Sequence, residues 1–238
     1  MPTNVLDELT SRSPSLSQSE SSLLKPEDLA RFASLYPLEG DVSKAFVDAA
    51  REHKVVAWDI ETSGLDWRSE RIALCQLLVK ERGLSIVKVA KGKKRPPRLA
   101  KILSDKNIQK IFHHAMFDLR FLCYHWGTWA NNVACTKIAA KLLDPEKSQG
   151  HTLATLVQQY LGVTLDKGVR KSDWLTWGLS AEQLKYAGDD VRYLPDLLDV
   201  LLKELDKKNR RELAMRCFAH IPTQVQLEIQ GFRDVFGY

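Results

Sequence analysis

The heptapeptide DIETSGL at residues 59–65 restricts this chain more than any other feature, because it places two acids directly after an apolar run. Asp59 and Glu61 stand two apart at the end of the run 55–58, and the alternation of a strand would point both carboxylates to one face. Two such carboxylates repel each other unless a proton or a cation joins them. A hard divalent metal ion is the natural partner for oxygen ligands. A strand that ends in a polar, capped turn is the alternative.

Asp118 is the next candidate ligand. The run 108–112 predicts a strand, and residues 115–126 predict a helix with a periodic apolar face. Asp118 would lie in the first turn of that helix, where the helix dipole favours an anion. That structural role requires no metal.

A tyrosine and an aspartate form the third pattern. Tyr186 and Asp190 are four residues apart on a predicted helix and therefore share one face. Such a pair is common in helices, so the pair alone indicates little.

The three patterns in this order resemble the DEDD-type 3′–5′ exonucleases that carry tyrosine in the third motif, the family of ribonuclease D and of the DNA polymerase I proofreading domain. DIETSGL matches the first motif, His114-x-x-x-Asp118 the second and Tyr186-x-x-x-Asp190 the third. The resemblance covers residues 54–205 and includes connecting segments at 135–140, 152–153, 161–167 and 171–174.

The resemblance implies two divalent ions, Mg²⁺ or Mn²⁺, that stabilise the charge developed in phosphodiester hydrolysis. Asp59, Glu61 and Asp190 would hold the ion that activates water, and Asp59 would bridge to the second ion. Asp118 would support the second ion through water. Tyr186 would orient the nucleophilic water, since a free phenol titrates near 10.

Substrate contacts are also implied by the resemblance. Thr62, Leu65 and His114 would contact the 3′-terminal nucleotide, with Leu65 as an apolar wedge against the base. The family motif often has Asn where this chain has His114. A second acid, Asp189, precedes Asp190, and the family spacing favours Asp190 as the ligand.

The implied activity is metal-dependent 3′–5′ hydrolysis of single-stranded nucleic acid or short oligonucleotides to nucleoside 5′-monophosphates. The alternative is a catalytically weak nucleic-acid-binding or proofreading subunit that acts with a polymerase, because residues 221–232 resemble the junction between the exonuclease and polymerase domains of DNA polymerase I. The expected partners are 3′ ends of single-stranded RNA or DNA, with a second copy of the chain or a polymerase left open. Residues 135–137 favour short oligonucleotides and the C-terminus favours DNA.

Length and composition agree with one α/β domain. The 238 residues are 44% hydrophobic, which is sufficient for a sizeable core. We expect a ribonuclease H-like mixed sheet flanked by helices, with helical additions at both ends. The expected segments are a disordered Ser-rich N-terminus over 1–24, the exonuclease domain over 25–206 and a helical extension over 207–238.

The element order follows from periodicity and helix signals. Helices are predicted over 26–36 and 41–53, and a long helix over 180–206. Strands near 54–60, 71–79 and 84–89 follow one another without a helix, which predicts an antiparallel start to the sheet. Later strands near 108–112 and 132–135 alternate with helices.

The charge distribution bears on the binding partners of the protein, and the cysteine content bears on its cellular compartment. The net charge is +5, and the stretch 82–104 has eight Lys or Arg residues and no acid. This stretch could follow a phosphate backbone, or it could form a solvated hairpin or loop. Four cysteines without a CxxC pattern and no signal peptide or transmembrane run predict an intracellular, cytoplasmic protein with no membrane partner, organelle targeting being left open. The histidines at 113, 114 and 125 lack the neighbours of a zinc site.

Overall fold

The structure is a computed structural model that describes residues 37–89, 92, 95–146, 150–166, 172–176, 178–232 and 234–237. The Ser-rich segment 1–24 and the helix predicted over 26–36 lie outside these residues. No helix in the described part of the chain combines the length and apolarity needed to cross a membrane.

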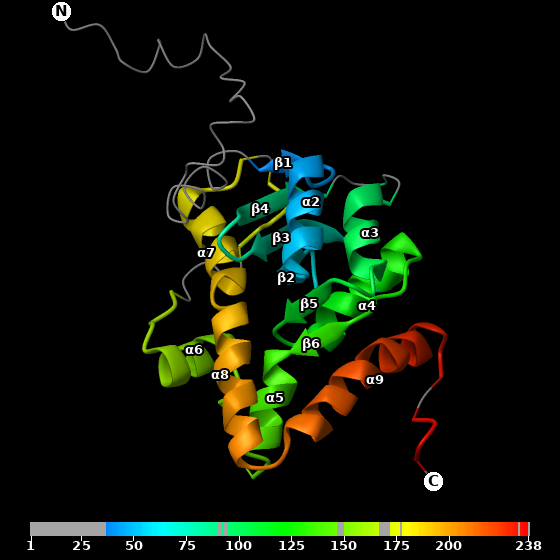
Figure 1. Cartoon of the computed structure of the whole chain (residues 1–238). Helices are drawn as coiled ribbons and strands as arrows, with labels where there is room; N and C mark the ends of the chain where they lie inside the picture. The colour runs from blue at the N-terminus through cyan, green and yellow to red at the C-terminus, as the bar shows by residue number, and fades with distance from the viewer. Residues whose placement is uncertain are drawn as a thin grey trace, which may run out of the picture.

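A mixed sheet with the strand order β1-β4-β3-β2-β5-β6 forms the centre of the fold (Figure 1). The strands are β1 Leu38–Glu39, β2 Val55–Thr62, β3 Ile72–Val79, β4 Gly83–Lys88, β5 Gln109–Phe112 and β6 Val133–Cys135. β2, β3 and β4 are antiparallel, whereas β5 pairs with β2 and β6 in parallel. The predicted α/β class and the antiparallel start of the sheet are confirmed.

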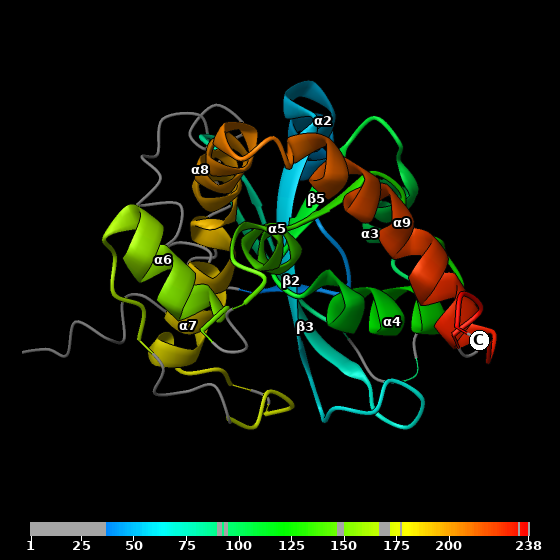
Figure 2. The same cartoon turned by 90° about the horizontal axis from the view of Figure 1, so that it is seen from below.

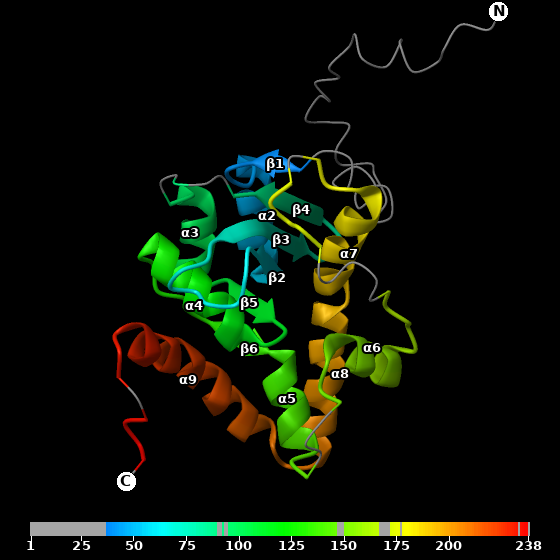
Figure 3. The same ribbon diagram turned by 180° about the vertical axis from the view of Figure 1, so that it is seen from behind.

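Helices cover the sheet on both sides. They are α2 Lys44–His53, α3 Pro97–Ser104, α4 Ala115–Trp126, α5 Thr136–Leu143, α6 Leu153–Leu161, α7 Ala181–Arg192, α8 Leu194–Lys207 and α9 Arg211–Ile229. α2 packs on β2 and β3, and α7 contacts β2, β3 and β4 from the side seen in Figure 3. α9 crosses beside α4 and β6, as Figure 2 shows from below.

The prediction of one helix over 180–206 is wrong, because the segment forms α7 and α8 with a break at Tyr193. Pro195 lies in the first turn of α8. A proline lacks the N–H that a continuous helix would use, and its ring clashes with the carbonyl four residues earlier. The chain therefore restarts its helix at this point, and α7 ends just after Asp190.

The basic stretch 82–104 is also not one loop. Lys88 ends β4, and Arg98 and Lys101 belong to α3. Residues 91, 93 and 94 lie outside the described part of the chain. Basic side chains of this stretch are thus distributed over a strand, a helix and a connection.

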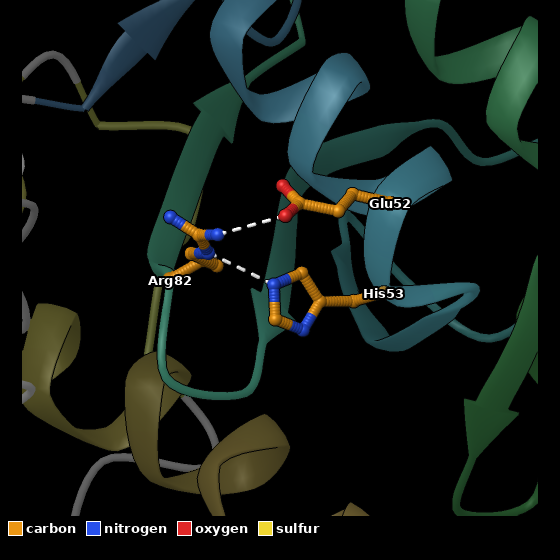
Figure 4. Close-up of polar contacts among 3 residues, drawn as sticks. All are labelled: Glu52, His53 and Arg82. Atoms are coloured by element: carbon orange, nitrogen blue, oxygen red, sulfur yellow. Dashed lines mark hydrogen bonds and ion pairs between the residues drawn. The ribbon is translucent and has the colours of Figure 1, made fainter.

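The β3–β4 turn is joined to the end of α2 by polar contacts on the surface (Figure 4). Arg82 Nη2 donates to Glu52 Oε1 at 3.0 Å, and Arg82 Nε donates to His53 Nε2 at 2.8 Å. These groups are exposed, so the cluster adds little stability, but it links the turn to the point where β2 begins.

Candidate functional site

The first part of the site is the C-terminal half of β2. Asp59 and Glu61 alternate there with the buried residues Trp58 and Ile60. One ligand oxygen each of Asp59, Glu61 and Asp190 lies within 4.8 Å of the others. The prediction that strand alternation brings the first two carboxylates to one face is confirmed.

The second part is Asp118, in the first turn of α4, as predicted. Strand β5 pairs with β2 only as far as Ala57, so the backbone of β2 beyond that residue has no strand on this side. The Ile60 N–H instead donates to the Asp118 carboxylate. Asp118 is 2% exposed, and it lies outside the three-acid group found among the described residues, although its charge acts on Asp59.

The third part is α7, whose start is fixed by a capping box between Ser180 and Gln183. Four residues apart on this helix, Tyr186 and Asp190 hydrogen-bond through their side chains. Asp189 instead pairs with Lys185 at 2.6 Å. The structure therefore joins Asp190, and not Asp189, to the acids of β2, as family spacing predicted.

Burial and mutual repulsion control the protonation of these groups. The pKa of Asp59 is raised well above its ordinary 3.8, first by burial and then by the charges of Asp118, Asp190 and Glu61. Burial also raises the pKa of Asp118, although its own backbone N–H and that of Ile60 oppose the shift. Without a cation, the site therefore holds more negative charge than its surroundings can stabilise.

A divalent cation fits this donor set. The three converging donors are all carboxylate oxygens, which hard ions such as Mg²⁺ and Mn²⁺ prefer. Their mutual separation of up to 4.8 Å is compatible with ligands around one ion, because each would lie about 2.0–2.6 Å from the metal. A cation would also relieve the repulsion from neighbouring acids that, after burial, raises the pKa of Asp59.

Of the three residues predicted to contact substrate, Thr62 ends β2, Leu65 lies in the turn that follows, and His114 immediately precedes α4. Thr62 Oγ1 donates to the Gly64 carbonyl at 2.6 Å, which closes the turn. Leu65 follows with 84% of its surface exposed, which is unusual for a large apolar side chain. His114 precedes α4 in the left-handed region, at φ 69°, and its ring stacks on Phe117. Contact of these residues with a nucleotide stays a prediction.

Sequence reasoning missed Gln76 and Trp174 as parts of the site. Gln76 Nε2 donates to Asp59 Oδ2 at 2.6 Å, and the buried Trp174 packs against Tyr186 with ring centroids 6.0 Å apart. A polar residue inside the apolar run 72–79 was a visible signal for Gln76, but its partner depends on the strand register.

His113, one of the histidines considered for zinc, has a structural environment. Its Nδ1 lies 2.8 Å from Thr136 Oγ1, and its Nε2 lies 3.1 Å from the His151 carbonyl. Burial is the main reason that the pKa of His113 is lowered to about 3. The ring is therefore neutral, with both nitrogens in hydrogen bonds.

A mixed sheet with a half-buried group of three carboxylates at the end of a central strand is a candidate metal site. The family model described as 3′-5′ exonuclease matches residues 39–206, and the chain belongs to this family. The resemblance inferred from the three motifs is thereby confirmed.

Individual relatives agree. Ribonuclease D of Zymomonas mobilis is 34% identical over 139 residues, which cover 58% of this chain and 35% of that protein. The solved structure of Brucella melitensis NrnC bound to pGG is 34% identical with a TM-score of 0.77, and the match covers 84% of this chain and 96% of that one. The same nuclease with bound Mg²⁺ is 33% identical, with the same TM-score and coverage. The chain spans only 35% to 39% of the length of the ribonuclease D sequences it matches.

Proposed function

We propose that this protein is a metal-dependent 3′–5′ exonuclease that releases nucleoside 5′-monophosphates from short single-stranded oligonucleotides. The observation that carries the proposal is the half-buried group of three converging carboxylates, Asp59, Glu61 and Asp190, with the buried Asp118 beside it. A nucleic-acid-binding subunit without activity would not need this complete set of carboxylates. Family membership supports the reaction class.

Asp59, Glu61 and Asp190 would hold one Mg²⁺ or Mn²⁺ ion, and Asp59 with Asp118 would hold a second. The ions would supply a nucleophilic water at neutral pH and stabilise the charge on the phosphoryl and leaving oxygens. The protein's contribution is to fix the ligands on β2, α4 and α7. α7 packs against β2, and α4 packs against β5, the strand beside β2.

Tyr186 would position the attacking water and would not remove its proton. Burial, followed by the charges of Asp190, Glu61 and Asp59, raises the pKa of the phenol above its ordinary 10. The hydroxyl is therefore protonated at neutral pH and can hold water by hydrogen bonds, whereas a general base must be able to lose its proton near the working pH.

Short substrates are favoured by the likeness to a nuclease solved with pGG, which is 34% identical with a TM-score of 0.77. Leu65, exposed at the turn, would pack on the 3′-terminal base. We also propose a reducing compartment such as the cytoplasm, because all four cysteines are free thiols. The boundaries 25–206 and 207–238, the Ser-rich segment and partners such as a polymerase stay predictions.

The test is hydrolysis of 5′-labelled substrates: a dinucleotide, a short and a long oligoribonucleotide, and the matching DNA strands. We expect Mg²⁺-dependent shortening from the 3′ end, with the dinucleotide and short strands degraded fastest and excess chelator abolishing the reaction. The Asp190→Asn variant should be inactive, and the neighbouring Asp189→Asn variant should match the wild type. Hydrolysis that survives chelation would exclude the metal mechanism, and a preference for long strands would exclude the proposed substrate class.

A further inference from the structure

Gln76 lies on β3 directly opposite Asp59 in the antiparallel register. Both side chains therefore point to the same face of the sheet. The Gln76 side chain is fully buried, and its Nε2 donates to Asp59 Oδ2 at 2.6 Å. The contact joins the middle of β3 to the carboxylate at the centre of the acidic site.

The carbonyl oxygen of the Gln76 side chain indicates that this residue does not contribute to stability. Gln76 Oε1 is buried and has no hydrogen-bond partner among the described residues. A buried acceptor without a partner is destabilising, and an apolar residue of similar size would avoid the penalty. Leu74, two residues earlier on the same face of β3, and Ile86, opposite Gln76 on β4, are buried and apolar, so a leucine would suit this position.

The chemical type of the donor also matters. Burial and three acids disfavour the ionised form of Asp59, and the Gln76 hydrogen bond opposes them. A lysine or arginine could donate as well, but its charge would compete with a divalent cation for the same carboxylates. A neutral amide fixes a carboxylate without reducing the negative charge that attracts the metal.

We propose that Gln76 is a positioning residue for the cation site, which holds the Asp59 carboxylate in the orientation needed to share an ion with Glu61 and Asp190. The inference rests on the proposed function only in assuming that this site binds a divalent cation. Gln76 itself touches neither metal nor substrate. It acts through Asp59, as outer hydrogen-bond partners of metal ligands commonly do.

The test compares Gln76→Leu with wild type in cation binding, measured by Mn²⁺ electron paramagnetic resonance and by Mg²⁺ calorimetry on the metal-free protein. We expect about ten- to hundredfold weaker binding in the variant, a melting temperature no lower than that of the metal-free wild type, and hydrolysis that recovers as Mg²⁺ is raised. Ser85→Ala is the matched control. Ser85 on β4 is also buried, and its hydroxyl has no hydrogen-bond partner within the described part of the chain. Ser85 pairs with Leu77 and therefore faces away from Asp59. Its cation affinity should equal that of the wild type.

A double-mutant cycle that combines Gln76→Leu with Asp59→Asn tests whether Gln76 acts on cation binding through Asp59 or through a general effect on the structure. If Gln76 acts through Asp59, Gln76→Leu should weaken cation binding much less in the Asp59→Asn background than in the wild type. Gln76→Asn, whose amide is one methylene shorter, replaces the leucine variant if that variant does not fold, and it should lose the same affinity.

A folded Gln76 variant with wild-type cation affinity would overturn the inference, and so would equal losses in the two Asp59 backgrounds. Because binding is measured directly, these results do not depend on catalysis. A wild-type protein that binds Mn²⁺ but hydrolyses no oligonucleotide would refute the proposed function and leave the role of Gln76 to be judged from binding alone.

Discussion

The two faces of β2 place alternate residues of one short strand in opposite environments. On one face Val56, Trp58 and Ile60 are buried in the hydrophobic core, and the Trp58 ring lies 6.0 Å from Phe112 and 6.1 Å from Trp126. On the other face, Asp59 and Glu61 meet further acids from α4 and α7.

The comparison shows that one face of β2 stabilises the fold and that the other face carries the candidate site. Burial of apolar surface on the Trp58 face stabilises the sheet. The acidic face opposes folding until a cation arrives, because its carboxylates are desolvated and repel one another. Substitutions on the two faces should therefore affect stability and activity separately.

The largest expected effect on the acidic side comes from Asp118→Ala. Turnover on a labelled oligonucleotide should fall at least about a hundredfold, since metal stabilisation of charge contributes several kcal/mol. The metal-free variant should stay folded, because the loss of a repelling carboxylate offsets part of the cost of leaving the Ile60 N–H without its acceptor. Single-turnover hydrolysis and thermal melting measure the two properties. A normally melting variant with wild-type turnover would remove Asp118 from the site.

Trp58→Ala should give the opposite result on the other face of the strand. Truncation of a fully buried tryptophan is expected to lower the free energy of unfolding by about 3–5 kcal/mol, measured by denaturant unfolding without metal. The molecules that remain folded should bind Mn²⁺ with wild-type affinity, and Trp58→Phe should lose less stability. Strongly weakened cation binding in folded Trp58→Ala protein would show that the two faces are not independent.

Tyr186→Phe tests the acidic face without removing a ligand. The ring packing and the cations should persist, while turnover falls by about tenfold to a thousandfold, as for a lost positioning contact. Substrate affinity should barely change. Asp190→Asn should instead weaken cation binding, with Asp189→Asn as the control that leaves it unchanged. Full activity of Tyr186→Phe, or its rescue by extra metal, would assign the phenol a different role.

The sequence predicts a residue of this site where the repeat of a single strand or helix determines the position of its side chain. Strand alternation placed Asp59 and Glu61 together, and the helical repeat placed Tyr186 with Asp190. The contact of Gln76 with Asp59 depends on the register between two strands, which a single sequence does not encode locally.

Asp118 shows the same limit at a different level. Its place in the first turn of α4 was predictable, but its hydrogen bond from Ile60 arises because β5 stops pairing with β2 at Ala57. The break at Tyr193 was missed although Pro195 was visible, because an apolar helical pattern continues across it. Tertiary arrangement decides each of these cases.

The smallest expected effect is the pH dependence of stability, which reports directly on the carboxylates of the acidic face. In the metal-free protein, the pKa values of Asp59 and Asp118 are raised above their ordinary 3.8. Between 3.8 and the raised values, the folded state binds more protons than the unfolded state. Stability should therefore fall as pH rises through this window, by at most about 1.4 kcal/mol per pH unit for each group.

Saturating Mg²⁺ should reverse the sign of that slope. Metal-bound carboxylates stay ionised in the folded state, so their folded pKa lies below the unfolded value, and stability is then lost as pH falls. Denaturant unfolding from pH 4 to 7, with Mg²⁺ and with chelator, measures both slopes. Asp118→Asn should flatten the metal-free slope, because one titrating group is removed, whereas Trp58→Phe should shift the whole curve without changing its slope. Equal slopes with and without Mg²⁺ would mean that the carboxylates of β2 and α4 do not bind the ion, and the contrast between the two faces of β2 would then concern packing alone.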